Sequence, residues 1–172
     1  MHDHVSSGSI PIFSILTCSN TRLPENDESG KVLHDILKNS GVEVADKRIV
    51  KDDFDEITSA VRKMIEKCDI LVITGGTGIT KYDVTIEAVR SLSQKEMTGF
   101  MVQFQQLSYK DVGTAAMLSG ASGFIVQRKA VFCLPGSPGY NKYIAFFNHC
   151  PDSGSDLIKV VLNYSLIGNL NP

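Results

Sequence analysis

The feature that most constrains the fold of this chain is a strand that runs directly into a glycine-rich turn, within residues 71–83. Residues 71–74 are apolar or β-branched, as in a buried strand. The turn at 75–78 contains three glycines, and a helical pattern begins near Asp83. In α/β proteins the backbone N–H groups of such a turn and of the following helix point outward, and the helix dipole favours negative charge there. These residues therefore predict an anion-binding site.

The turn matches neither of the two common phosphate-binding patterns. A Walker loop carries Lys and then Ser or Thr after its last glycine, whereas Gly78 is followed by Ile79 and Thr80. The dinucleotide pattern G-x-G-x-x-G is also absent. We therefore expect an anion site of another kind, with the carboxylate of Asp83 beside it.

The first half of the chain alternates strands and helices. A β-α-β-α-β-α order implies a parallel sheet with right-handed crossovers, so the fold class predicted is α/β with a mostly parallel sheet. The expected strands are 10–17, 42–50 and 69–74, and the expected helices are 28–40, 53–68 and 83–92.

The second half is less regular. No internal repeat or long linker divides it, so we expect a flexible tail at 1–9 and a single domain at 10–172. Helices are expected at 98–109 and 112–119, then two strands at 124–126 and 130–134, a turn at 135–139, a helix rich in Tyr and Phe, and a final helix from about residue 153.

Composition excludes several classes of protein. The net charge of −2 argues against nucleic acid or an anionic membrane as the main partner. The sequence has no apolar run of the ~20 residues that a spanning helix needs, and its N-terminus lacks the pattern of a signal peptide. The four cysteines are far apart, which favours reduced thiols in the cytoplasm, with Cys18 and Cys133 as small core residues.

Three segments are expected to meet beyond the carboxyl ends of the strands, where open parallel sheets bind ligands. They are Asp52 with Asp53, the glycine turn with Asp83, and residues 135–139. A carboxylate beside a phosphate-binding turn repels phosphate unless a cation lies between them, and Mg²⁺ held by carboxylates and phosphate oxygens resolves that conflict. The chemistry predicted is phosphoryl or nucleotidyl transfer.

Structural roles compete with these assignments. Asp83 could equally cap its own helix, and Asp53 is more plausibly a helix cap than a functional acid. Asp52 has no evident structural role, which favours it as the second acid. Ser137 lies between two prolines and could belong either to an ordinary turn or to a second anion-binding turn.

Four segments in this order resemble the MoaB/MogA family of molybdenum cofactor biosynthesis proteins, and the MoaB branch more closely. They are 74–78, 83–85, 113–115 and 134–138, supported by 19–22, 27–30 and 49–53. The resemblance implies a three-layer α/β/α fold, assembled as a homotrimer or hexamer, that binds molybdopterin and adenylylates it with ATP and Mg²⁺, releasing pyrophosphate. It also implies association with other proteins of the pathway.

The resemblance assigns roles to individual positions. Asp52 and Asp83 correspond to the catalytic and metal-binding acids of the family. The substrate-binding positions are Thr74, Gly75, Gly76, Thr77, Gly78, Ser119, Pro135, Gly136, Ser137 and Pro138.

The chain departs from the family pattern at a few positions. Asn20 replaces an aspartate, Gly120 replaces an arginine, and Met101-Val102 replaces a glycine-glutamate pair. Two alternatives therefore remain open: a protein that binds molybdopterin without turnover, and a related domain that acts on nucleotide pyrophosphates. Self-association is also expected, because Phe100, Phe104, Phe146 and Phe147 supply more aromatic surface than one small core needs.

Overall fold

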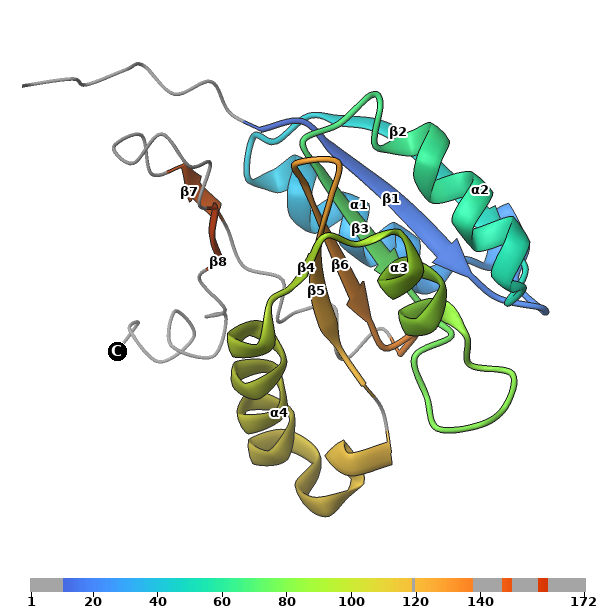
Figure 1. The fold of residues 1–172 in the computed structure, drawn as a ribbon, viewed down its shortest axis with the longest axis vertical. Coiled ribbons are helices and arrows are strands. Elements are labelled where there is room, and N and C mark those ends of the chain that lie inside the picture. The colour runs from blue at the N-terminus through green and yellow to red at the C-terminus, as the bar shows by residue number, and fades with distance from the viewer. Residues whose placement is uncertain (1–10, 119, 138–146, 150–157, 161–172) are drawn as a thin grey trace, which may run out of the picture.

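The computed structural model describes residues 11–118, 120–137, 147–149 and 158–160 (Figure 1). Its strands are β1 (Phe13–Cys18), β2 (Val44–Val50), β3 (Ile70–Thr74), β4 (Lys95–Glu96), β5 (Ser122–Val126), β6 (Lys129–Leu134), β7 (Phe147–His149) and β8 (Ile158–Val160). Its helices are η1 (Pro24–Asn26), α1 (Glu28–Asn39), α2 (Phe54–Met64), α3 (Thr85–Leu92), α4 (Thr98–Val112) and η2 (Gly113–Leu118), of which η1 and η2 are 3₁₀ helices.

A six-stranded, mostly parallel sheet confirms the predicted α/β class. The strand order is β2-β1-β3-β6-β5-β4. β2, β1, β3 and β6 are parallel, while β5 and β4 add antiparallel pairs at the far edge. Thr17, Thr74 and Leu134 stand in register across β1, β3 and β6. The residues that follow these three strands therefore meet at one edge of the sheet.

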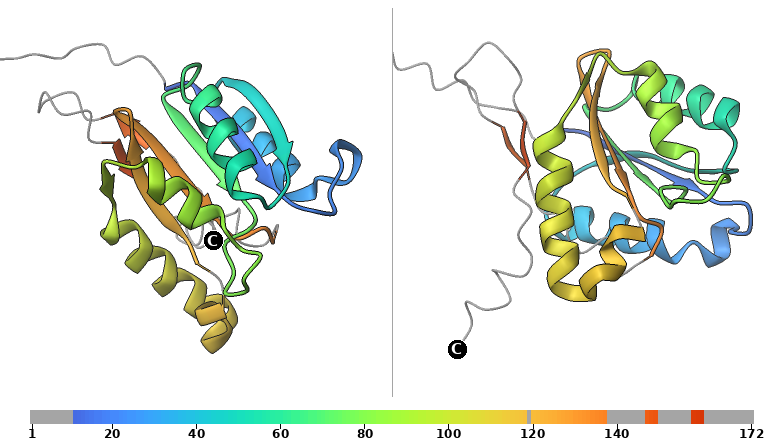
Figure 2. Two further views of the ribbon diagram at one scale, coloured as in Figure 1. Left: turned by 45° about the vertical axis from the view of Figure 1, so that its right-hand side comes forward. Right: turned by 60° about the horizontal axis from the view of Figure 1, so that its bottom comes forward.

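Helices cover both faces of the sheet and produce the three layers (Figure 2). α2 and α3 enclose one core with apolar residues of β1, β3, β5 and β6, and α1 and α4 enclose a second core on the other face. All five residues of β3 are buried, as expected of a central parallel strand that is covered on both sides. This makes β3 a rigid support for the glycine turn at its end.

Capping side chains determine where two of the helices begin. The Asp53 carboxylate accepts hydrogen bonds from the N–H groups of Asp55 and Glu56 at 3.0 Å, so the expected cap of α2 is confirmed. Asp27 caps α1 by accepting from the N–H of Gly30 at 3.0 Å. The helix predicted at 83–92 begins two residues later, at Thr85.

The segment after α4 differs from the prediction. α4 continues to Val112, and a 3₁₀ helix at Gly113–Leu118 takes the place of the helix predicted at 112–119. Gly113 has φ of +59° and ψ of −139°, a non-helical conformation that favours glycine and ends the α-helix. The predicted hairpin of β5 and β6 is confirmed, with Gln127 and Arg128 at positive φ in its two-residue turn.

The predicted final helix is wrong within the described residues. Ile158–Val160 is a strand that pairs antiparallel with Phe147–His149. β-branched residues on either side of Lys159 suit a strand, and the paired segment decides between strand and helix for so short an apolar run. The Tyr- and Phe-rich helix expected after residue 139 falls mostly outside the described residues, and Phe147–His149 is strand. The predicted tail at 1–9 also lies outside them.

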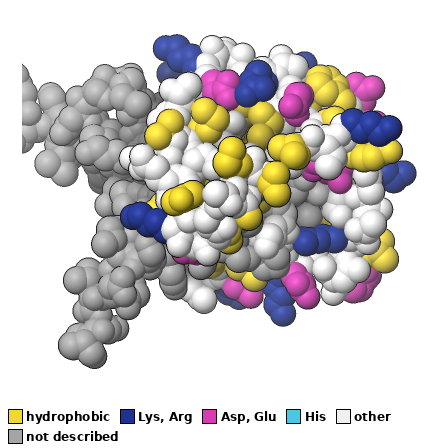
Figure 3. All heavy atoms as spheres, turned by 90° about the horizontal axis from the view of Figure 1, so that it is seen from below, with side chains coloured by type: hydrophobic (Ala, Val, Ile, Leu, Met, Phe, Trp, Pro, Cys, Tyr) yellow, Lys and Arg dark blue, Asp and Glu magenta, His cyan; other side chains and the backbone are white. Residues whose placement is uncertain are grey.

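The aromatic argument for self-association is wrong for two of its four residues. Phe100 and Phe104 are 8% and 0% exposed and pack in the core, where the Phe100 ring lies 4.9 Å from that of Phe132. The side chains of Phe146 and Phe147 lie outside the described part of the chain. Figure 3 shows hydrophobic side chains on the underside of the molecule. The exposed apolar residues of α4 and η2 are Met101, Val102, Tyr109, Val112, Met117 and Leu118.

Among the residues that the structure describes, no helix is both long enough and apolar enough to cross a membrane.

Candidate functional site

The glycine turn is held between the ends of β1 and β6. Gly75 and Gly76 have φ of +99° and +63°, conformations that favour glycine. The N–H of Gly75 donates to the carbonyl of Leu134 at 3.0 Å. A Cβ added to Gly75 would lie 2.2 Å from the carbonyl oxygen of Cys18, so the turn packs directly against the backbone of β1. Its conformation is therefore tightly determined.

Asp52 lies beside this turn, just beyond the end of β2. Its N–H donates to Oδ1 of Asn20 at 3.2 Å, which joins the segment after β1 to the segment after β2. Its own Oδ1 is buried and makes no hydrogen bond within the described structure. A Cβ added to Gly76 would lie 2.5 Å from that oxygen. The absence of Cβ at Gly76 is thus what lets the carboxylate approach the turn.

Asp83 faces the other end of the same turn. Its Oδ2 accepts from the N–H of Thr80 at 3.0 Å and from the Thr80 hydroxyl at 2.6 Å. A Cβ added to Gly78 would lie 2.7 Å from Oδ2. The N-cap of α3 is Val84, which makes no side-chain cap bond. Asp83 is therefore not a helix cap, and this alternative from the sequence is wrong.

The two carboxylates have opposite electrostatic environments. Burial raises the pKa of Asp52, repulsion from Asp83 raises it further, and a hydrogen bond with the backbone of Asn20 offsets part of the rise. Burial also acts to raise the pKa of Asp83, but hydrogen bonds from the Thr80 hydroxyl and from the backbone of Thr80 and Gly78 outweigh it and hold that pKa below its ordinary value. A cation between the two would relieve their repulsion.

Asp52→Asn is expected to stabilise the folded protein at neutral pH. The pKa of Asp52 is higher in the folded chain than in the unfolded chain, so the folded state keeps the Asp52 proton up to a higher pH. The free energy of unfolding therefore falls as the pH rises from the unfolded-state pKa through the folded-state pKa. Below the unfolded pKa both states are protonated and the effect vanishes. Thermal unfolding of both proteins over a series of pH values measures it, and an Asn variant less stable than the original at neutral pH would contradict the expectation.

A second turn, after β6, packs against the first. The Thr74 hydroxyl donates to the carbonyl of Pro135 at 3.1 Å, and a Cβ on Gly136 would lie 3.1 Å from Cα of Gly75. Ser137 is exposed. The structure thus brings the second predicted ligand segment next to the glycine turn. Ser119 and Pro138 lie outside the described residues.

Arg22 and Ser29 hold this second turn in place. The sequence motifs predicted no role for either residue. Nη2 of Arg22 donates to the carbonyl of Gly136 at 2.9 Å, and the Ser29 hydroxyl donates to the same oxygen. Arg22 in turn lies 3.8 Å from the fully buried carboxylate of Asp27, and Lys47 lies 3.1 Å from it. Arg22 and Asp27 occur in the two supporting family segments, but only the fold shows that they share one network.

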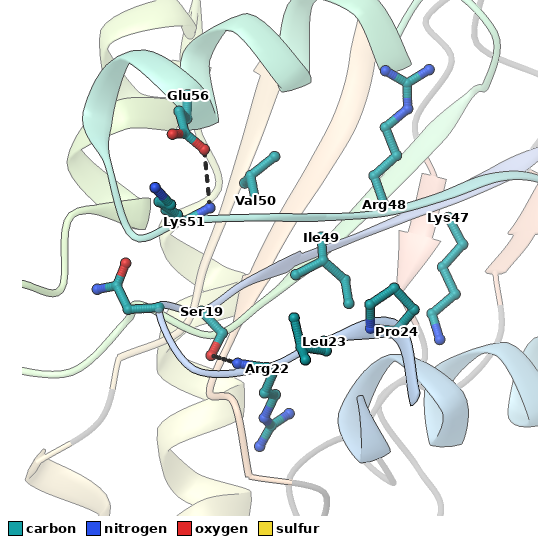
Figure 4. Close-up of a pocket in the computed structure, with 11 residues that line it drawn as sticks. Ser19, Arg22, Leu23, Pro24, Lys47, Arg48, Ile49, Val50, Lys51 and Glu56 are labelled. Carbon is teal, nitrogen blue, oxygen red and sulfur yellow. Dashed lines mark hydrogen bonds between the residues drawn. The ribbon is translucent and has the colours of Figure 1, made fainter. Parts of the chain in front are cut away.

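A cavity of about 510 Å³ lies along the edge strand β2 (Figure 4), and Asp52 is not among the residues that line it. Its lining includes Asn20, which accepts a hydrogen bond from the N–H of Asp52, and Lys51, the residue before Asp52 in the chain. Lys47 and Arg48 point to opposite sides of β2 in Figure 4. Its remaining lining comes from the loop after β1, from β2 and from the first turn of α2: Ser19, Arg22, Leu23, Pro24, Ile49, Val50 and Glu56. The lining is mixed, with apolar and basic side chains, and three of the basic ones are already paired: Arg22 and Lys47 with Asp27, and Arg48 with Asp46 at 2.7 Å.

The donor set around the glycine turn fits Mg²⁺. Within the described residues no group of three His, Cys, Asp or Glu side chains could hold a metal. A site built on Asp52 and Asp83 therefore has two carboxylates, both in contact with the glycine turn. Mg²⁺ is commonly bound in this way, with one or two carboxylates, substrate phosphates and several waters. The two acids and the glycine turn therefore form a candidate site, and the cavity along β2 lies next to it.

Comparison with known proteins shows which class of protein has this fold and these sequence motifs. Residues 14–148 match the family described as "Probable molybdopterin binding domain". The chain is 49% identical over 128 residues to Molybdenum cofactor biosynthesis protein B of Bacillus cereus, and the match covers 73% of this chain and 76% of that protein.

Solved structures agree with this relationship. A crystal structure of Molybdenum cofactor biosynthesis protein B superposes with a TM-score of 0.76 at 44% identity, covering 80% of this chain and 87% of the other. The tungsten cofactor synthesizing protein MoaB of Pyrococcus furiosus superposes with a TM-score of 0.71 at 34% identity, covering 79% and 88%. The chain therefore belongs to the molybdenum cofactor biosynthesis family.

Proposed function

We propose that this protein adenylylates molybdopterin with ATP and Mg²⁺ and releases pyrophosphate. The observation that carries the proposal is the convergence of Asp52 and Asp83 on opposite ends of one glycine turn, at the edge of the sheet where ligands bind. Membership of the molybdenum cofactor biosynthesis family supports molybdopterin as the second substrate.

Each part of the site has a role in this reaction. The N–H groups of Gly75 and Gly78 are already used by Leu134 and Asp83, so the backbone N–H groups of Gly76 and Thr77 would receive phosphate oxygens. Arg22 holds the second turn in place beside them. The cavity along β2 offers room for one of the two ring systems. Asp52 and Asp83 would hold Mg²⁺, which neutralises charge on the triphosphate and on the departing pyrophosphate.

The bond changes follow from the two substrates. An oxygen of the terminal phosphate of molybdopterin forms a bond to the α-phosphorus of ATP. The bond between that phosphorus and the oxygen bridging to the β-phosphate breaks, and pyrophosphate leaves with the electron pair. Little covalent participation by the protein is needed, because positioning and charge neutralisation account for most of the catalysis of such a transfer.

Incubation of the purified protein with molybdopterin, ATP and Mg²⁺ tests the proposal. We expect adenylylated molybdopterin by chromatography and one pyrophosphate released per molecule of product. Neither should form when ATP is omitted or when EDTA removes Mg²⁺. Absence of product with folded protein, intact molybdopterin, ATP and Mg²⁺ all present would refute the proposed activity.

A second candidate is a protein that binds molybdopterin without turnover. Gly120 favours it, because this residue lies against the glycine turn, with its N–H 2.8 Å from the carbonyl of Thr77, yet brings no side chain to it. Calorimetric titration with molybdopterin separates the candidates: binding without product supports the second, and absence of binding excludes both.

A further inference from the structure

Two buried polar atoms that make no hydrogen bond with any described residue lie at the base of the site. They are Oγ1 of Thr85, whose residue is 0% exposed, and Oδ1 of Asp52. Buried polar groups are nearly always paired, so two orphaned atoms at the same place require an explanation. The role proposed above for Asp52 does not supply one, because a metal would approach the carboxylate from the open side, whereas Oδ1 is the buried oxygen.

The two atoms converge on Gly76. A Cβ built on this glycine would lie 2.3 Å from Oγ1 of Thr85 and 2.5 Å from Oδ1 of Asp52. The N–H of Thr85 also donates to the carbonyl of Gly76 at 3.0 Å, which holds the first residue of α3 against the turn. The two atoms make no direct hydrogen bond in the described structure. Both lie within 2.5 Å of the same point, however, so one bound water or a small rotation of the threonine side chain would join them.

Their chemistry is complementary. A threonine hydroxyl can donate a hydrogen bond, and an ionised carboxylate can only accept one. We propose that Thr85 is a positioning residue, whose hydroxyl donates to the buried oxygen of Asp52, directly or through one water, and so orients the carboxylate toward the metal position beside the glycine turn. The metal part of this assignment rests on the proposed function, and the pairing itself does not.

Cys18 is the competing partner for the hydroxyl. Burial raises the pKa of this thiol to about 12, contact with the Thr85 hydroxyl lowers it in part, and the charge of Asp52 raises it. The group is therefore a neutral thiol, which is a weaker acceptor than the carboxylate. It remains the main alternative, and the experiment has to separate the two.

A double-mutant cycle without metal tests the pairing. Thr85→Val keeps the shape of the side chain and removes the hydroxyl, so it leaves the Asp52 oxygen unpaired and is expected to lower the thermal midpoint by several degrees. In an Asp52→Ala background the same change should have no effect or raise the midpoint. In a Cys18→Ala background it should lower the midpoint as in the original protein. Equal effects with and without Asp52, or an effect that disappears with Cys18, would overturn the pairing.

Titration with Mn²⁺ alone, followed by electron paramagnetic resonance, tests the positioning role. Removing a group that orients a metal ligand weakens binding about 10- to 100-fold, which is the loss expected for Thr85→Val. Thr85→Ser keeps the hydroxyl and should bind within about twofold of the original protein. Unchanged affinity in the valine variant overturns the positioning role. If the original protein binds no Mn²⁺, the metal site of the proposed function fails with it, while the unfolding cycle still decides the pairing.

Discussion

Asp83→Asn is expected to lower the rate of AMP transfer to molybdopterin about 100- to 1,000-fold, the loss typical of removing one group that stabilises charge in the transition state. The carboxylate is held by two hydrogen bonds from Thr80 and touches the turn at Gly78, and its lowered pKa keeps it ionised at neutral pH. Asn has nearly the same shape but cannot neutralise a divalent cation. Both the release of pyrophosphate and the yield of adenylylated pterin should fall together.

Asp53→Asn is the matched control. Asp53 follows Asp52 directly in the chain, but its carboxylate caps α2, and Asn is an equally good cap. The control should keep its full rate and its stability. If Asp83→Asn reacts as fast as this control, Asp83 has no part in the reaction, and the observation that carries the proposed function is lost.

Gly75→Ala is expected to destabilise the fold by about 3 kcal/mol, from left-handed strain and from overpacking together. For a chain of this size that is a drop of roughly 6 to 12 °C in thermal midpoint. The added methyl would lie 2.2 Å from the carbonyl oxygen of Cys18, which belongs to the backbone of β1 and cannot swing away as a side chain would. Loss of ligand binding should accompany the loss of stability, because the turn moves.

Gly41→Ala separates strain from collision. Gly41 also has a positive φ, of +74°, but nothing lies within 4 Å of an added Cβ. This variant should cost only about 1 kcal/mol, the strain of a non-glycine residue in the left-handed region. Thermal unfolding of the two variants side by side measures the difference. Equal losses would show that the packing of Gly75 against β1 contributes nothing.

Local patterns sufficed for the first half of the fold. The buried run that became β3, the cap at Asp53 and the alternation of elements each depend on residues close together in the chain. Hydrophobic periodicity and capping are local properties, so they are readable in the sequence. The same reasoning placed Asp52, the glycine turn and Pro135 at one edge of the sheet, where the structure has them.

In other parts of the chain, contacts with distant segments determined the structure, and the local sequence pattern gave a wrong prediction. The sequence predicts that Phe100 and Phe104 are exposed aromatic surface. In the structure both side chains of α4 point into the second core, which they share with Phe132. Ile158–Val160 is strand because Phe147–His149 pairs with it. Neither result depends on neighbouring residues alone. A helix face or a short apolar run acquires its environment only when a distant segment packs against it.

The sequence by itself determined the α/β class, the glycine turn and the acids that could serve it, because strand burial, turn conformation and capping follow from adjacent residues. Only the tertiary structure decided how the turn is used. It left the capping of α3 without Asp83, held Asp52 and Asp83 at opposite ends of one turn, and buried the Thr85 hydroxyl and one oxygen of Asp52 beside Gly76. These outcomes depend on Gly75, Gly76 and Gly78 lacking a Cβ where backbone and carboxylates approach them, and on β1, β2 and β3 lying side by side in register. The glycines and the carboxylates come close together only once the sheet is assembled.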